Sequence, residues 1–357
     1  MNKQRKTLII LTPAFAANET DSYLPAQESF ISSLNKNYPS LRIIILTFHF
    51  PVTNQPSYNW HGNKVFTFSG ALKGKINSLI LWKRVWQKLS SLQKEFDLIG
   101  IFSFFCSESA FIGHHFAKRK KLRHHIWVLG QDAKKENKQV KRIRPNPEEL
   151  IVISDFLRKE FERNHKIKPS HTIPIGIDPD DFSKDIPERT IGLIGAGSLS
   201  ALKQYNVFLN VVKEIIEKCP DVHAVICGNG PEETNLRNQI GELDIAENIT
   251  MTGLKKDRPE VLDLLLQSKI LLHTSSYEGF GMICTEALYA GAHVISFIKP
   301  MDENIKHWHI VKDPAAMALK AIELLQDINT TYYSVLPYSM NDTADAIMQL
   351  FNYQEFN

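Results

Sequence analysis

The sequence of 357 residues has few cysteines, no long apolar run and no low-complexity stretch. Its four cysteines, Cys106, Cys219, Cys227 and Cys284, are scattered, without a Cys-x-x-Cys motif or a histidine at metal-ligand spacing. This pattern argues against a disulfide framework and a zinc site. No window approaches the roughly 20 apolar residues of a membrane span. We therefore expect a cytoplasmic protein with reduced thiols and no metal site.

The N-terminus imitates a signal peptide, because basic residues, an apolar run and small residues follow one another up to Ala17. The apolar run from Leu8 to Leu11 is too short for such a signal, and Pro13 follows it at once. A run of this length is typical of a buried strand in a parallel sheet. We expect the chain to begin with such a strand.

The net charge of +3 conceals two oppositely charged halves. Residues 1–175 hold 28 Lys and Arg against 13 Asp and Glu, or +15, and residues 176–357 hold 14 against 26, or −12. Much of the excess lies in residues 117–125 and 134–145, which form either a solvated face or a docking surface. A basic half favours an anionic membrane surface, a phosphorylated lipid or nucleic acid as partner. The lack of a nucleic-acid-binding motif argues against the last of these.

Residues 77–92 combine apolar and basic side chains at helical spacing. Leu79, Trp82, Trp86 and Leu89 share one stripe, with lysine and arginine between them. Packing in the core is the favoured interpretation for the tryptophans, and anchoring at a membrane interface is the alternative.

Apolar runs alternate with amphipathic helical segments in both halves. Strands are predicted at 7–11, 42–48, 97–103, 124–130 and 149–154, and again at 191–197, 223–228, 248–253, 269–274 and 293–297. Alternation of this kind predicts doubly wound parallel sheets with helices on both faces. The length of the chain predicts two such α/β domains.

The unusual residues of the second half follow the predicted strands, at the edge where parallel sheets bind ligands. Glu278 belongs to a glycine-containing turn, and a helix follows from Met282, so its first N–H groups can hold an anion. Glu286, about one turn further on, can accept two hydrogen bonds from a ribose diol. A diol, a diphosphate and a polyol in that order describe a nucleotide sugar. The alternative is that both acids lie on a solvated helix face.

Residues 275–296, SSYEGFGMICTEALYAGAHVIS, resemble the E-x7-E segment of family 4 of the retaining glycosyltransferases, which have the GT-B fold. The resemblance extends to GSLSALK (197–203), VICGNGPE (225–232), ITMTGLKK (249–256) and IPIGID (173–178). It implies catalytic roles for Glu278, Lys203 and Asp132. The implied donor-binding residues are Gly197, Ser198, Lys203, Gly228, Asn229, Gly230, Leu254, Glu278, Gly279, Phe280, Gly281, Met282, Ile283 and Glu286.

The resemblance also implies an organisation and a mechanism. We expect an acceptor-binding domain at 1–172, a linker at 173–190, a nucleotide-sugar-binding domain at 191–335 and a C-terminal helix at 336–357 that returns to the first domain, with a cleft between the two domains. In this family Lys203 would neutralise the donor diphosphate, Glu286 would hold the ribose, and no metal or cofactor besides the donor is needed.

Three positions depart from the family pattern. Ser198 stands where the family has arginine and Gln204 where it has glycine, and Leu129 replaces the histidine that touches the donor sugar. We expect a retaining glycosyltransferase that uses a nucleotide sugar and a glycan or lipid-linked acceptor in envelope or exopolysaccharide synthesis, in the cytoplasm or on the inner face of its membrane. The alternative is a non-catalytic nucleotide-sugar-binding subunit.

Overall fold

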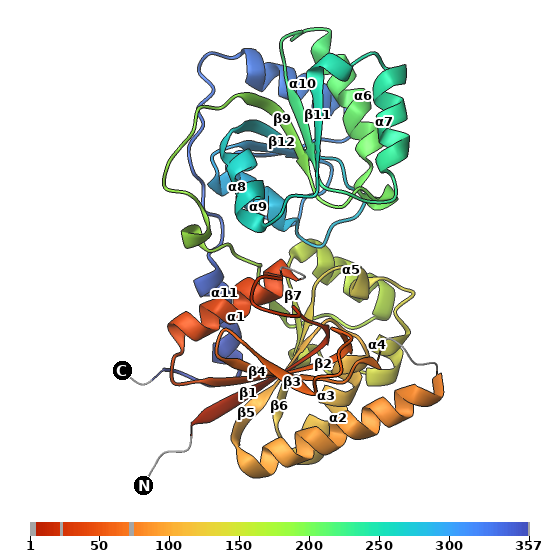
Figure 1. Ribbon diagram of the computed structural model, residues 1–357, viewed down its shortest axis with the longest axis vertical. Helices are drawn as coiled ribbons and strands as arrows, with labels where there is room; N and C mark the ends of the chain where they lie inside the picture. Colours follow the sequence, from red (N-terminus) through yellow and green to blue (C-terminus); the bar gives the residue numbers. More distant parts are fainter. Residues whose placement is uncertain (1–4, 22–23, 71–74, 356–357) are drawn as a thin grey trace. The chain divides into compact units, whose positions relative to one another are not determined.

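The computed structural model describes residues 5–21, 24–70 and 75–355, and the chain forms two compact units (Figure 1). The first unit comprises residues 1–175 and 340–357, and the second comprises residues 176–339. Each unit contains its own sheet with helices on both faces, which confirms the predicted α/β class. Within the described ranges, no helix is both long and apolar enough to cross a membrane.

The sheet of the first unit has the strand order β3-β4-β2-β1-β5-β6-β7-β8, and only the β3–β4 pair is antiparallel. The central strand β1 is buried along most of its length, as the apolar run at 8–11 predicts. The strands are β1 (Lys6–Ala14), β2 (Arg42–Phe50), β3 (Ser57–Trp60), β4 (Asn63–Thr67), β5 (Asp97–Phe104), β6 (Arg123–Val128), β7 (Leu150–Val152) and β8 (His171–Thr172).

Helices cover both faces of this sheet. One face packs on α2 and α3, and here Trp82 and Trp86 lie against Phe111 and Phe116 with ring centroids 5.0 Å apart in each pair. Both tryptophans are half-buried and pack against the core of this face, which favours the core interpretation, whereas Leu79 on the same helix is 67% exposed. The helices are α1 (Pro25–Asn37), α2 (Lys75–Glu95), α3 (Glu108–Lys120), α4 (Lys138–Ile143), α5 (Asp155–His165) and α11 (Met340–Leu350).

The C-terminal helix α11 packs in the first unit, against α1. Ser33 donates a hydrogen bond to Asn341 (2.8 Å), and Tyr38 donates one to Asp345 (2.7 Å). After the helix, the ring of Phe351 lies against Gly100 on β5, where a Cβ atom would be 2.6 Å from it. Helix α11 and Phe351 thus complete a face of the first sheet.

The second unit has a fully parallel sheet in the order β11-β10-β9-β12-β13-β14. Numbered within the unit, this is the 3-2-1-4-5-6 order of nucleotide-binding doubly wound sheets. Its strands are β9 (Ile191–Ala196), β10 (Ala224–Cys227), β11 (Ile249–Gly253), β12 (Ser268–His273), β13 (His293–Ser296) and β14 (Trp308–Ile310). Its helices are α6 (Tyr205–Ile216), α7 (Glu233–Glu242), α8 (Arg258–Leu266), α9 (Met282–Tyr289) and α10 (Pro314–Gln326).

The segment expected to be a linker, residues 173–190, packs largely on the second unit. Ile177 and Phe182 join the core that α8 and α9 form on one face of its sheet. Arg189 donates hydrogen bonds to the backbone carbonyls of Ser268 and Ala290. Because these residues are anchored, the second unit begins at Gly176 rather than after the segment.

Candidate functional site

The predicted donor-binding residues gather at the carboxyl edge of the second sheet. The chain order of the strands reverses between β9 and β12, which pair directly, and doubly wound sheets bind ligands in the crevice outside such a reversal. Residues 197–203 follow β9 and residues 274–281 follow β12. Gly228 to Gly230 follow β10, and Leu254, which is 72% exposed, follows β11. The sequence-based placement of these loops around one edge agrees with this topology.

Glycines let the loops after β9 and β10 touch through their backbones. A Cβ atom on Gly228 would lie 1.9 Å from the carbonyl oxygen of Gly197, and one on Gly230 would lie 2.4 Å from that of Leu199. Gly197 and Gly228 also have φ values of +139° and +140°, which side chains disfavour. The N–H of Leu199 donates to the carbonyl of Asn229 at 2.8 Å. The glycines therefore hold Ser198 and Asn229 in adjacent exposed loops.

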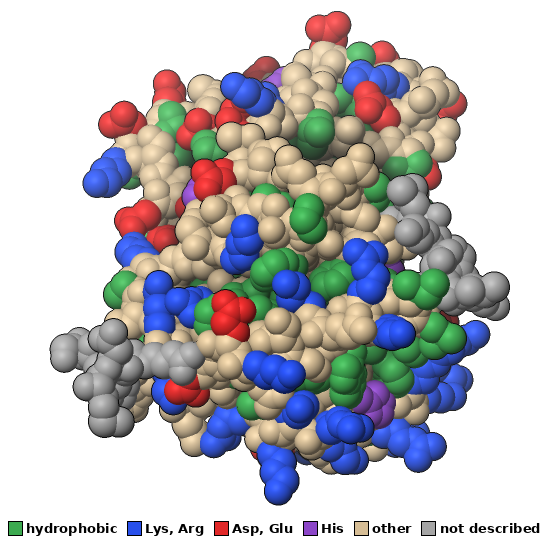
Figure 2. All heavy atoms as spheres, turned by 60° about the horizontal axis from the view of Figure 1, so that its bottom comes forward, with side chains coloured by type: hydrophobic (Ala, Val, Ile, Leu, Met, Phe, Trp, Pro, Cys, Tyr) green, Lys and Arg blue, Asp and Glu red, His purple; other side chains and the backbone are tan. Residues whose placement is uncertain are grey.

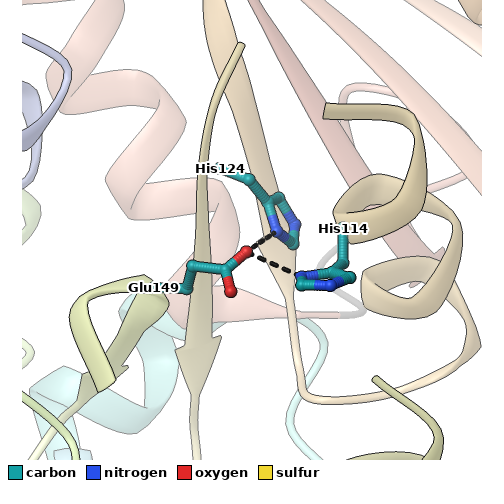
Figure 3. A group of neighbouring side chains, drawn as sticks. All are labelled: His114, His124 and Glu149. Carbon is teal, nitrogen blue, oxygen red and sulfur yellow. Dashed lines mark hydrogen bonds and ion pairs between the residues drawn. The ribbon is translucent and has the colours of Figure 1, made fainter. Parts of the chain in front are cut away.

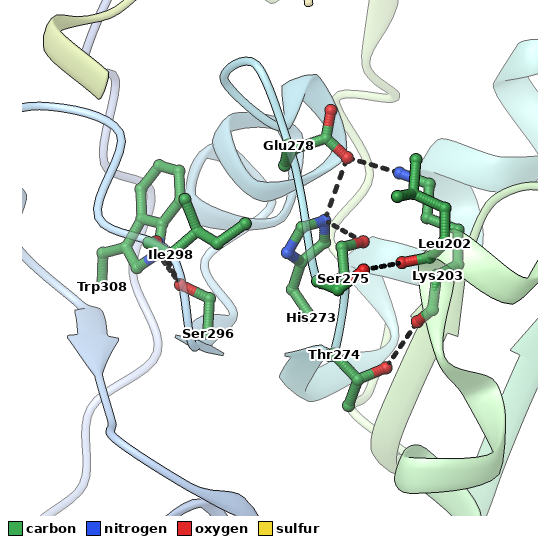
Figure 4. Close-up of polar contacts among 10 residues, drawn as sticks. Leu202, Lys203, His273, Thr274, Ser275, Glu278, Ser296, Ile298 and Trp308 are labelled. Atoms are coloured by element: carbon green, nitrogen blue, oxygen red, sulfur yellow. Dashed lines mark hydrogen bonds and ion pairs between the residues drawn. The ribbon is translucent and has the colours of Figure 1, made fainter. Parts of the chain in front are cut away.

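Lys203 and Glu278, two predicted catalytic residues, form an ion pair across the switch point (Figure 4). Lys203 Nζ lies 2.5 Å from Glu278 Oε2, and both side chains are mostly buried. His273, the last residue of β12, places Nε2 at 3.5 Å from the same carboxylate oxygen. Although burial opposes it, the hydrogen bond from His273 and the charge of Lys203 lower the pKa of Glu278 to about 2. The carboxylate is therefore ionised at neutral pH.

The turn after β12 is tied to the residues around Lys203 by hydrogen bonds. Thr274 Oγ1 donates to the carbonyl of Lys203 at 2.9 Å, and the N–H of Ser276 donates to the carbonyl of Leu202 at 3.0 Å. Ser275 Oγ lies 3.2 Å from His273 Nε2, so the imidazole contacts both Ser275 and Glu278. These contacts fix the distance between the cation and the acid.

Helix α9 begins just after this turn. Gly281 is its N-cap residue, with φ +84°, and Met282 is its first residue. The N–H of Cys284 donates to the carbonyl of Gly281 at 2.8 Å, whereas the N–H groups of Met282 and Ile283 have no carbonyl partner within the helix and lie at the positive end of its dipole, so these two suit an anion. Phe280, 3% exposed, packs edge-on against Trp308 and Tyr338 and fixes the approach to the helix.

Glu286 lies inside α9 and is 2% exposed, so the solvated-face alternative is wrong for this residue. Its carboxylate forms an ion pair with Arg258, the first residue of α8. The side chain of Arg258 is 24% exposed and that of Glu286 only 3%. The structure thus supplies a cation that the sequence patterns did not indicate, beside the acid expected to hold a ribose.

Asp132, the third predicted catalytic residue, belongs to the first unit. Its carboxylate accepts hydrogen bonds from the backbone N–H groups of Cys106 (2.9 Å), Gly130 (2.8 Å) and Leu129 (3.1 Å). Burial raises the pKa of Asp132 above its usual value, and the three N–H groups partly offset this effect. The carboxylate thereby joins the loop after β5 to the loop after β6.

Within the described part of the chain, one cluster has a metal-ligating donor set: His114, His124 and Glu149 (Figure 3). Glu149 Oε1 lies 2.8 Å from His114 Nδ1 and 3.1 Å from His124 Nδ1. His124 Nε2 lies 3.0 Å from Ser103 Oγ, and Glu149 Oε2 accepts from the N–H of Asn146. Although burial opposes it, the hydrogen bonds from the two histidines lower the pKa of Glu149. The donor atoms thus satisfy one another as a hydrogen-bonded network.

Sequence reasoning found Lys203, Glu278 and the glycine loops but missed His273 and Arg258. A histidine at the carboxyl end of a strand that borders the switch point is a usable signal for His273. The pairing of Arg258 with Glu286 depends on how α8 packs against α9, and no local sequence pattern predicts this packing.

The fold and the site define a class of protein. HepE of Anabaena, solved with UDP and glucose, superposes with a TM-score of 0.66 and 16% identity over 96% of this chain and 95% of its own. TarM superposes with a TM-score of 0.68 and 12% identity, covering 98% and 99% of the two chains. These likenesses establish the GT-B glycosyltransferase fold.

The sequence of the second unit matches a family model. Residues 177–332 match the family model described as glycosyl transferases group 1, so the resemblance predicted from the motifs is confirmed. The gpi3 subunit of the phosphatidylinositol N-acetylglucosaminyltransferase of Schizosaccharomyces pombe is 25% identical over 165 residues, which are 45% of this chain and 36% of the relative. The poly(ribitol-phosphate) alpha-N-acetylglucosaminyltransferase of Staphylococcus aureus is 23% identical over 207 residues, or 57% and 36% of the two chains. The chain thus spans about a third of the length of these relatives.

Proposed function

We propose that this protein transfers a sugar from a nucleotide diphosphate to a glycan or lipid-linked acceptor, with retention of the anomeric configuration and without a metal ion. The observation that carries the proposal is the convergence of Lys203, Glu278 and the start of α9 at the switch point of the second sheet. A cation and the N–H groups of Met282 and Ile283 suit a diphosphate, and an ionised carboxylate suits sugar hydroxyl groups.

The chemistry requires stabilisation of the leaving group. A glycosyl-phosphate bond breaks through an oxocarbenium-like state, and negative charge grows on the departing diphosphate. Lys203 and the N-terminus of α9 would stabilise that charge. Because Lys203 is paired with Glu278, the Lys203 ammonium group would interact with a bound diphosphate and with the Glu278 carboxylate at the same time. His273 would keep Glu278 in place as this happens.

The relatives named as N-acetylglucosaminyltransferases and the UDP in the HepE structure support UDP-N-acetylglucosamine as the first donor to test. Thermal shift with UDP-, GDP- and ADP-sugars identifies the base, and release of nucleotide from the stabilising donor measures turnover. NMR of the product reports the anomeric configuration. Lys203→Gln is expected to lower donor turnover at least tenfold, because about 2 kcal/mol of charge stabilisation is lost. Lys218→Gln, an equal charge change at an exposed position of the same unit, serves as the matched control.

The ribose assignment of Glu286 has its own test. Glu286→Gln is expected to weaken UDP binding by about 1 to 3 kcal/mol, since hydrogen bonds to a charged acceptor become hydrogen bonds to a neutral amide. Isothermal calorimetry with UDP measures this change, and an unaltered affinity would rule out a ribose contact at this carboxylate.

The second candidate is a non-catalytic nucleotide-sugar-binding subunit. Ser198 and Leu129, in place of the arginine and histidine of the family pattern, favour it. Donor hydrolysis separates the two candidates, because a binding subunit is stabilised by the donor but releases no nucleotide from it.

We also propose envelope or exopolysaccharide synthesis as the setting, with an anionic membrane surface as the docking partner of the basic first unit. Lys and Arg side chains gather on the face of that unit seen in Figure 2. Cosedimentation with anionic vesicles tests this idea, and binding that does not respond to salt would contradict it.

A further inference from the structure

A basic cavity lies on the first unit, outside every residue assigned to the transfer reaction. It has a volume of about 650 Å³ and is bounded by residues of α2, α3, α4 and the turn after α4. Lys118, Lys141, Arg142 and Arg144 line it, and its described lining contains no acidic side chain. Glu108, which lies outside the lining, attracts Arg142 and offsets part of this charge. The cations that remain repel one another unless a solvent ion or a ligand screens them. The charge therefore indicates an anionic ligand.

The cations stand on a fixed framework. Helix α4 is anchored by Val140 and Ile143, each 2% exposed, and is capped at its start by Asn137, whose side chain also donates to the carbonyls of Cys106 and Asp132. The chain then reverses at Arg144, whose φ is +50° and whose N–H donates to the carbonyl of Val140. The cationic side chains themselves are exposed, but the anchored backbone keeps those of α4 and its turn beside one cavity.

One wall of the cavity is aromatic. The rings of Trp82 and Phe111 lie 5.0 Å apart, and the Trp82 indole N–H donates to Glu108, which orients the indole. Ligand pockets commonly combine an apolar wall with a few convergent polar groups, because the wall excludes water while the polar groups set orientation. A ligand with a carbon skeleton fits this cavity better than a bare inorganic ion.

A buried histidine contributes to the cavity. His114 lines it, yet its side chain is only 7% exposed, and its Nδ1 is held by Glu149 at 2.8 Å (Figure 3). With Nδ1 engaged, Nε2 is the ring atom left to meet a ligand. The network of Glu149, His124 and Ser103 thus holds a polar group in the lining of the basic cavity.

We propose that this cavity binds the phosphate group of an organic phosphate, with Arg144 and Lys141 contacting the phosphate oxygens and Trp82 and Phe111 contacting the attached carbon skeleton. Guanidinium groups match phosphate in charge and in bidentate geometry, and lysine adds a compact positive charge. The phosphate could be that of a lipid headgroup or of a soluble metabolite, and the test distinguishes the two sources.

The test measures binding of three probes without any donor sugar: inorganic phosphate, sn-glycerol 3-phosphate, and vesicles of phosphatidylcholine with or without phosphatidic acid. Calorimetry is used for the soluble probes and cosedimentation for the vesicles. The double variant Lys141→Gln/Arg144→Gln is expected to bind the phosphate probes at least about tenfold more weakly than wild type, since hydrogen bonds to charged groups are lost. The matched control is Lys94→Gln/Lys138→Gln, which removes the same charge from exposed positions outside the cavity.

Each outcome decides the proposal. Tighter binding of glycerol phosphate than of inorganic phosphate, lost in the double variant and kept in the control, supports it with a soluble source. Binding confined to phosphatidic acid vesicles, with the same dependence on the double variant, supports it with a lipid source. Equal losses of affinity in the double variant and in the control would show that diffuse surface charge binds the probes, and this result would overturn the proposal. A lack of binding of every phosphate probe would also overturn it. Lys118→Gln repeats the test if the double variant loses its wild-type melting temperature.

The proposal is independent of the transfer reaction. The double variant leaves Lys203, Glu278 and Glu286 untouched, so the thermal shift that the donor sugar produces is expected to stay unchanged. A protein that binds phosphate at this cavity but shows no sugar transfer would refute only the proposed function, and the reverse result would refute only the cavity.

Discussion

The ion pair between Arg258 and Glu286 predicts that removing the arginine costs more stability than removing the charge of the glutamate. The Glu286 side chain is 3% exposed and that of Arg258 is 24% exposed, so only the arginine can turn to water when its partner is removed. Arg258→Met leaves a buried carboxylate without its ion pair, and a loss of about 3 to 5 kcal/mol in the free energy of unfolding is expected. Glu286→Gln leaves a cation that can be hydrated, and a loss of about 1 to 2 kcal/mol is expected.

The two substitutions should not be additive, because they remove the same interaction. The double variant is expected to lose about 2 kcal/mol less than the sum of the single losses. Urea unfolding followed by hydrogen exchange of peptides from α8 and α9 reports the second unit separately from the first. Arg237→Met, which breaks an exposed pair with Glu233 in the same unit, is the control and should cost less than about 1 kcal/mol. Equal losses from Arg258→Met and Glu286→Gln, or simple additivity, would refute the reasoning.

Three further predictions concern the loops around the site. Gln204 has φ +50° at a position where a side chain is disfavoured, so Gln204→Gly is expected to stabilise the protein by up to about 1 kcal/mol in urea unfolding. Glu278 has a pKa lowered from 4.5 to about 2. Its contribution to the free energy of unfolding is therefore complete above pH 4.5 and is lost as the pH falls towards 2. The stability difference between wild type and Glu278→Gln, at most about 3 kcal/mol, should therefore vanish over that window, and a difference independent of pH would exclude the ion pair as its source. Gly230→Ala is expected to cost about 1 to 3 kcal/mol because its Cβ would meet the backbone of Leu199, whereas Gly241→Ala, with no atom within 4 Å of the new Cβ, should cost nothing measurable.

The long buried strands were predictable because their apolar runs differ from everything around them. The predictions at 42–48 and 97–103 lie within β2 and β5, and the predicted strand at 191–197 corresponds to β9. The hairpin of β3 and β4 was missed, although His61 and Gly62, which join the two strands, both have positive φ and the exposure of β4 alternates. Short strands carry too few residues for their period to stand out, and β14, with three residues, was missed for the same reason.

Glu278 and Glu286 illustrate how far the site could be predicted. Their separation into a turn residue and a helix residue follows from the glycines between them, and the structure places Glu278 before α9 and Glu286 within it. The residues that pair with these two acids could not be predicted from the sequence. His273 meets Glu278 through the local turn after β12, and Arg258 meets Glu286 through the packing of two helices.

The sequence by itself determined the parallel parts of the two sheets, the glycine loops at the strand ends and the candidate donor-binding residues, because strand length, periodicity and glycine spacing are local properties. Only the tertiary structure decided that Lys203 and Glu278 neutralise each other and that Arg258 accompanies Glu286. It also brought the cations of α3 and α4 around one cavity. These pairings join residues far apart in the chain, and their energies depend on burial and distance.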